Sequence, residues 1–217
     1  MKKPSISVGW RALAALALLP LLLSLGCGAI KRWAYAGGDR DRWQRPEEVI
    51  QLLGIKPGDH LADLGAGGGY FTYPLAEATG PDGIVYAIDV DPDMTRYLEE
   101  HSREIGADNV RVVLAAPDDP SIPDASIDLL FTCNTYHHLK DRVTYFERAQ
   151  RLLRPGGRVA IIEYEEEGGF QVLSPHATPK DVILWELTRA GYRLERDYGL
   201  LEKQTFLIFS IDSSQEP

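Results

Sequence analysis

Short apolar runs alternate with amphipathic segments along most of this chain, and the alternation constrains the fold more than any other feature. Segments with helical spacing occupy residues 70–79, 92–106 and 141–154. The strand-like runs around them read "HLADLG", "IVYAIDV", "NVRVVLA", "IDLLFTCN" and "RVAIIEY". Strands alternating with helices of this length predict βαβ units with right-handed crossovers, and therefore a parallel sheet.

The end of the chain breaks this alternation. A predicted helix closes at Gly191, and two β-rich runs, 192–199 and 203–211, follow it with a short connection between them. Two strands joined so closely pair antiparallel. The sequence therefore predicts an α/β fold of the Rossmann-like, doubly wound kind, with a mostly parallel seven-stranded sheet that an antiparallel C-terminal hairpin closes.

The stretch "LADLGAGGGYFTYPLA" places four glycines directly after the first predicted strand. Ligands of open α/β sheets lie beyond the carboxyl ends of the strands, and glycines let a ligand approach the backbone. A dinucleotide loop needs the spacing G-x-G-x-x-G or G-x-G-x-x-A. Tyr70 or Thr72 occupies the last position of that pattern here, so the spacing disfavours a nicotinamide cofactor.

The spacing that fits is D-x-G-x-G-x-G, which resembles the cofactor loop of the class I S-adenosylmethionine-dependent methyltransferases. The resemblance covers roughly residues 46–211 and implies S-adenosylmethionine as the cofactor. It implies that Asp63 faces the methionine ammonium, that Asp89 holds the ribose and that Asp118 faces the adenine, with Asp119 as the alternative for this last role. The cofactor-binding residues predicted in this way are Asp63, Gly65, Ala66, Gly67, Gly69, Asp89, Val90, Asp118 and Asn134.

The methyl acceptor leaves a weaker trace in the sequence. His137 and His138 follow the fourth predicted strand and are candidates for a general base, because imidazole titrates near neutral pH; one of them can equally pack the next helix. Glu163 and Glu165, after the fifth strand, are further candidates. No spacing predicts a metal site. The chain has no room for a separate substrate domain, so we expect a small or lipid-like acceptor.

The first 27 residues have the pattern of a leader. Lys2 and Lys3 precede an apolar run that ends at Leu25-Gly26-Cys27, typical of a secretory signal and similar to a bacterial lipoprotein cleavage box. We expect membrane attachment through a lipid on Cys27. The alternative is an uncleaved anchor, since residues 12–30 would form a helix of about 28 Å. The predicted organisation is a leader at 1–27, a linker at 28–45 and a methyltransferase domain at 46–217.

The net charge excludes one class of partner. The formal net charge is −9, and three of the basic residues lie in the leader, so the body is more acidic still. Such a surface repels phosphates, and we expect no nucleic-acid partner. Two alternatives to a methyltransferase remain open: a nicotinamide-dependent oxidoreductase, and a membrane-anchored Rossmann-like module without catalysis.

Overall fold

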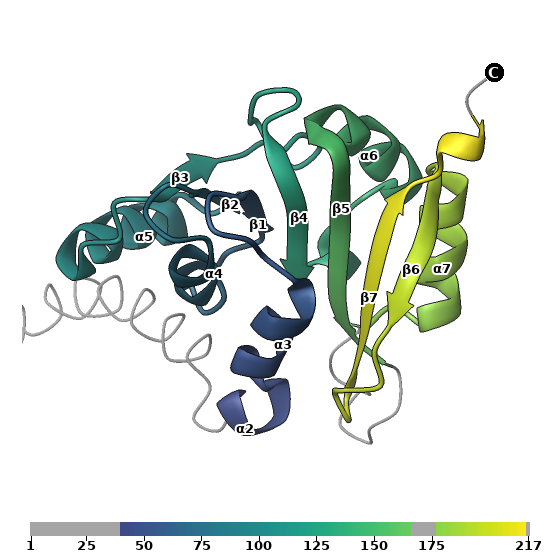
Figure 1. The fold of residues 1–217 in the computed structure, drawn as a ribbon, viewed down its shortest axis with the longest axis horizontal. Helices are drawn as coiled ribbons and strands as arrows, with labels where there is room; N and C mark the ends of the chain where they lie inside the picture. The colour runs from purple at the N-terminus through teal and green to yellow at the C-terminus, as the bar shows by residue number, and fades with distance from the viewer. Residues whose placement is uncertain (1–39, 166–176, 216–217) are drawn as a thin grey trace, which may run out of the picture. The chain divides into compact units, whose positions relative to one another are not determined.

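The computed structural model describes residues 40–165 and 177–215, and these form one layered α/β domain (Figure 1). Seven strands pair in the order β3-β2-β1-β4-β5-β7-β6. The strands are β1 (His60–Leu64), β2 (Ile84–Asp89), β3 (Val110–Leu114), β4 (Ile127–Cys133), β5 (Leu153–Tyr164), β6 (Tyr192–Asp197) and β7 (Gln204–Ile211). The first five are mutually parallel, and β7 is antiparallel to both of its neighbours. The predicted fold class is confirmed.

Helices cover both faces of this sheet. The helices are α2 (Arg40–Gln44), α3 (Pro46–Leu53), α4 (Thr72–Thr79), α5 (Pro92–Ile105), α6 (Arg142–Ala149) and α7 (Lys180–Arg189). Apolar residues of α3, α4 and α5 pack with one set of strand side chains, and those of α6 and α7 pack with the other set. Because side chains alternate across a strand, the buried strands supply apolar residues to both layers, which explains their almost continuous apolar sequence.

The strand order creates a switch point between β1 and β4. In the order of the sheet, β2 and β3 lie on the far side of β1, and β5 lies on the far side of β4. The helices that follow β1 and β4 therefore pack on opposite faces of the sheet, and a doubly wound sheet forms its crevice at the carboxyl ends of two such strands. Ligands of doubly wound sheets bind at this position. The loop after β1 and the turn after β4 lie at its rim.

Local boundaries differ from the sequence prediction in two places. The helix expected to reach residue 154 ends at Ala149, a 3-10 turn spans Gln150–Leu152, and β5 already begins at Leu153. Residues 40–44, expected to be linker, form α2, and the side chain of Gln44 is fully buried. This short helix shows no apolar periodicity in the sequence; the hydrogen bonds of Gln44 and the ring contact of Trp43 with Tyr164 join it to the domain.

The predicted leader and most of the predicted linker lie outside the described residues. Across 40–165 and 177–215, no helix has both the length and the apolar character that a membrane span requires. Membrane attachment through Cys27 therefore stays a prediction.

Candidate active site

The glycine loop connects β1 to α4 and folds against the end of β2. The backbone N–H groups of Gly65 and Ala66 both donate to the Ile88 carbonyl, at 2.8 and 3.0 Å. Gly65 has φ +79°, and a Cβ at this position would lie 2.0 Å from Thr135 Oγ1. Gly67 and Gly69 also have positive φ, at 54° and 85°. Glycine is therefore favoured in this loop for two reasons: the backbone has positive φ, and at Gly65 a side chain would collide with Thr135.

Asp63 lies within β1 directly before this loop and is only 3% exposed. The Thr72 hydroxyl, at the start of α4, donates to Asp63 Oδ2 at 2.6 Å. Burial, together with the charge of the Asp89 carboxylate, raises the pKa of Asp63 to about 6, against the lowering effects of the Thr72 hydrogen bond and the Arg40 charge. A buried carboxylate with incomplete compensation is well suited to receive a cation.

Asp89 ends β2 and faces the same loop. One of its carboxylate oxygens accepts the Gly67 N–H at 2.8 Å, and the other accepts the Asp91 N–H at 2.9 Å. Asp91 instead caps α5, because its side chain accepts the Asp93 N–H at 2.8 Å. Asp91 is thus a helix cap, and Asp89 is joined directly to the glycine loop.

Two large apolar side chains stay exposed at the carboxyl ends of β2 and β3. Val90 is 58% exposed and Leu114 is 56% exposed, although most apolar residues nearby are buried. Asp118, in the segment after β3, is exposed as well. Its neighbour Asp119 is bonded to the Arg151 guanidinium at 2.7 Å and to the Ser121 N–H. Of the two adjacent aspartates, Asp118 is therefore the better candidate for contact with a ligand.

The carboxyl end of β4 is held by a chain of side-chain amides. Asn134 has φ +56°, and its Oδ1 accepts a hydrogen bond from the Gln204 side chain at the start of β7. Gln44 Nε2 lies 3.2 Å from Gln204 Oε1 and 2.8 Å from Cys133 Sγ. Segments from both ends of the domain thus meet at the end of β4.

The two candidate histidines differ in their surroundings. His137 lies in the 3-10 turn Tyr136–His138, and its Nδ1 is 3.0 Å from Glu163 Oε1. Glu163 is fully buried and also accepts the backbone N–H groups of His137 and Tyr164, at 3.2 and 2.8 Å. His138 is exposed, with its ring 4.1 Å from that of His137. The contact with the buried Glu163 carboxylate belongs to His137.

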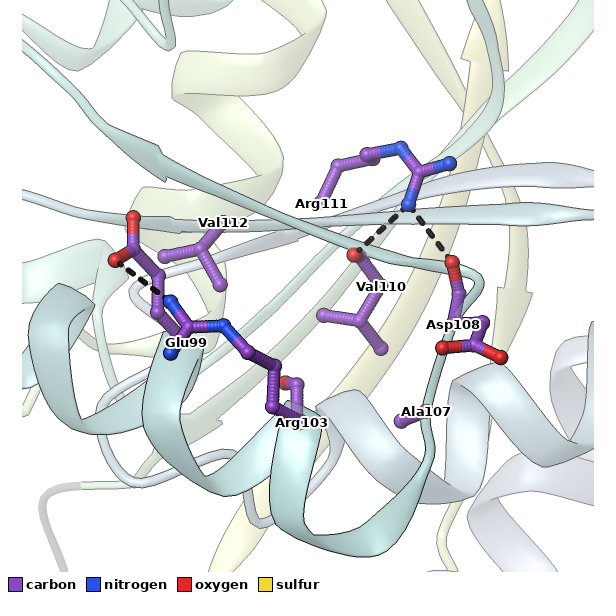
Figure 2. A pocket seen from close by; sticks show the side chains of 8 residues that line it. Glu99, Arg103, Ala107, Asp108, Val110, Arg111 and Val112 are labelled. Atoms are coloured by element: carbon purple, nitrogen blue, oxygen red, sulfur yellow. Dashed lines mark hydrogen bonds and ion pairs between the residues drawn. The ribbon is translucent and has the colours of Figure 1, made fainter.

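A separate hollow of about 390 Å³ lies at the amino end of β3 (Figure 2). Arg111 Nη1 donates there to the carbonyls of Asp108 and Val110, at 2.7 and 3.3 Å. Arg103 pairs with Glu99 at 3.8 Å. These side chains are engaged with their own neighbours, and the hollow is at the end of β3 opposite to the glycine loop, so it is not part of the candidate site.

The fold and the site together define a class of protein: a seven-stranded sheet of this order, with a glycine loop after β1 and acidic residues in β1 and at the end of β2, is that of the class I methyltransferases. Residues 62–161 match the family described as "Methyltransferase domain". Residues 62–161 are thus a methyltransferase domain, and the described fold is similar to that of solved class I S-adenosylmethionine-dependent methyltransferases, whose cofactor is S-adenosylmethionine.

Known proteins of this class are similar over different lengths. A solved S-adenosylmethionine-dependent methyltransferase from Aquifex aeolicus superposes with a TM-score of 0.77 at 27% identity, covering 83% of this chain and 97% of that one. The arsenite methyltransferase of Halobacterium salinarum is 28% identical over 68% of this chain and 33% of its own length. The nocamycin O-methyltransferase of Saccharothrix syringae is 34% identical over 52% of this chain and 40% of its own. The chain thus spans well under half the length of these two curated relatives.

The residues at the loop fit such a cofactor. Gly65, Gly67 and Gly69 have positive φ, so this part of the loop presents backbone rather than side chains, and the buried Asp63 carboxylate with its raised pKa suits an ammonium group. Asp89 offers carboxylate oxygens at the end of β2, and the exposed Val90 offers an apolar surface beside them. Among the described side chains, no three of His, Cys, Asp or Glu gather as a metal ion would require.

Sequence reasoning missed several side chains at this site. Thr72 is the hydrogen-bond partner of Asp63, yet a threonine nine residues further on carries no signal in a single sequence. Gln44 and Gln204 are 160 residues apart and meet only in the folded chain. Leu114 could have been noticed as an apolar residue at a strand end, but nothing in the sequence indicates that it stays exposed.

Proposed function

We propose that this protein transfers a methyl group from S-adenosylmethionine to a small or lipid-like acceptor. The observation that carries the proposal is the convergence of Asp63, the Gly65–Gly69 loop and Asp89 at the switch point of the sheet. When bound, the cofactor supplies a sulfonium methyl with an excellent leaving group. The protein has mainly to hold the acceptor in line with it and to exclude water.

Binding of the cofactor is tested by calorimetry on the full chain, purified in detergent. We expect S-adenosylmethionine and S-adenosylhomocysteine to bind and NAD to give no heat. Binding of NAD would instead support the oxidoreductase alternative. Failure of all three ligands would support a module without catalysis.

Aromatic side chains near the carboxyl ends of the strands support a small acceptor. The rings of Trp43 and Tyr164 lie 6.0 Å apart at the end of β5. Aromatic side chains of this kind offer a flat, apolar surface for a small molecule. The names of the two curated relatives, arsenite and nocamycin methyltransferases, also indicate small acceptors.

The acceptor class is tested with methyl-labelled S-adenosylmethionine and three fractions of a bacterial extract: water-soluble small molecules, extracted lipids and proteins. We expect label in the small-molecule or lipid fraction. Label confined to the protein fraction would refute the proposal.

We propose His137, rather than His138, as the base or acceptor-binding residue. The support is the contact of its Nδ1 with Glu163, since a carboxylate at Nδ1 fixes the tautomer that carries its lone pair on Nε2. A base is needed only for an acceptor that loses a proton. With the labelled acceptor, His137→Gln is expected to lower kcat and change its pH profile, whereas His138→Gln is expected to leave both near wild type; equal effects would contradict this assignment.

We also propose attachment to the membrane through Cys27, on the leader pattern alone. This location would favour acceptors that partition into lipid. The corresponding test is given in the Discussion.

A further inference from the structure

Arg40 brings a positive charge to the candidate site from outside the matched family region, residues 62–161. Its guanidinium carbon lies 3.7 Å from the centroid of the Tyr70 ring, directly after the glycine loop. The Tyr70 hydroxyl in turn donates to Asp41 Oδ1 at 2.6 Å. Helix α2 is therefore attached to the loop through two successive residues.

A second set of contacts fixes Arg40 against the end of β4. Arg40 Nε donates to Gln44 Oε1, one turn further along α2. The other end of that buried amide, Nε2, reaches Cys133 Sγ at 2.8 Å. Because β4 is the neighbour of β1 at the switch point, these contacts bring the guanidinium near Asp63, close enough for its charge to lower the pKa of that carboxyl.

The buried Asp63 carboxyl and the nearby Arg40 guanidinium are complementary to a ligand that carries both a positive and a negative charge. The methionine part of the cofactor carries an ammonium and a carboxylate on the same carbon. The Thr72 hydroxyl donates the hydrogen bond to Asp63, and Arg40 acts on this carboxyl through its charge. The guanidinium of arginine, in turn, is the side chain best shaped to bind a carboxylate by paired N–H groups.

We propose that Arg40 binds the carboxylate of the cofactor's methionine part, with Asp63 facing the ammonium, so that α2 is an integral part of the cofactor site. The proposal rests on the proposed function and extends it to a residue upstream of the matched domain. The bond from Arg40 to Gln44 holds the guanidinium in place, and the stacking on Tyr70 limits its rotation.

Binding measurements with two ligands test the proposal. Calorimetry on the full chain uses S-adenosylhomocysteine and its decarboxylated form, which keeps the amine and lacks the carboxylate. We expect Arg40→Ala to weaken binding of S-adenosylhomocysteine about 10- to 100-fold, the usual effect of losing a charge-assisted hydrogen bond. Binding of the decarboxylated ligand is expected to change less than threefold. Arg40→Lys is expected to lie between wild type and Arg40→Ala.

Arg42→Ala is the matched control, because it removes the same charge from an exposed position of the same helix. It is expected to leave both affinities unchanged, and thermal unfolding of each variant reports whether the domain is folded. Equal weakening of both ligands in Arg40→Ala would show that Arg40 acts through Asp63 or through the fold, and would overturn the proposal. Unchanged affinity would overturn it as well. Failure of the wild-type chain to bind S-adenosylhomocysteine would refute the proposed function itself.

Discussion

The substitution Asp63→Asn tests whether the buried Asp63 carboxylate lowers the stability of the ligand-free domain and favours binding of a cationic ligand group. Asparagine has nearly the same shape, and its side-chain carbonyl can still accept the Thr72 hydroxyl. The change removes only the charge from a side chain that is 3% exposed. We therefore expect the ligand-free domain to become more stable while its affinity for S-adenosylhomocysteine falls.

The magnitude follows from the pKa of Asp63. Its pKa is about 6 in the folded protein, against an ordinary value of 3.8 for an aspartate. Between these two values the folded state keeps a proton that the unfolded state has released, so the free energy of unfolding falls as the pH rises. The difference corresponds to about 3 kcal/mol once the pH exceeds both values. For a domain of this size that is roughly 6–12 °C in Tm.

The assay is thermal and urea unfolding of the full chain in detergent, from pH 3 to pH 8 and without ligand. Below pH 4 the variant and the wild type are expected to be equally stable, and the gap in favour of the variant is expected to grow up to about pH 7. Asp82→Asn, at an exposed position, is the control and is expected to show a constant difference near zero. An Asp63→Asn domain that is less stable than wild type at pH 7, or a gap that does not depend on pH, would refute the reasoning.

Three further predictions concern the loop, the ribose carboxylate and the leader. Gly65→Ala is expected to cost well over 2 kcal/mol of stability, because its Cβ would collide with Thr135, whereas Gly58→Ala, with a similar φ and open space, is expected to cost only about 1 kcal/mol; equal losses in urea unfolding would contradict the steric argument. Asp89→Ala is expected to weaken S-adenosylhomocysteine binding by about 1–3 kcal/mol in calorimetry, since the ligand loses a charge-assisted bond and the loop loses its own; unchanged affinity would remove Asp89 from the site. Cys27→Ser is expected to abolish incorporation of a clickable fatty acid in cells, and equal label in both proteins, or none in either, would favour the uncleaved anchor.

The amino-acid sequence by itself determined the class of fold and the place of the loop. Short, almost continuous apolar runs and helical segments of period 3.6 are local patterns, so their alternation along the chain predicted the parallel sheet. The antiparallel end of the sheet followed from the closely spaced pair of β-rich runs. The loop glycines carry their own signal, because positive φ demands that residue type. The register of Asp89 followed as well, since consecutive parallel strands end at the same edge.

Only the tertiary structure decided which polar side chains work together. Nothing local distinguishes Asp118 from Asp119 or His137 from His138; the distinction comes from Arg151 and Glu163, which fold in from distant positions. Helix α2 is the clearest case. Its sequence has no apolar period and resembles a linker. Hydrogen bonds from Gln44 to Cys133 and Gln204, which are 89 and 160 positions further along the chain, nevertheless hold it at the site. Such bonds depend on where two remote backbone segments meet, and that meeting point leaves no pattern along the chain.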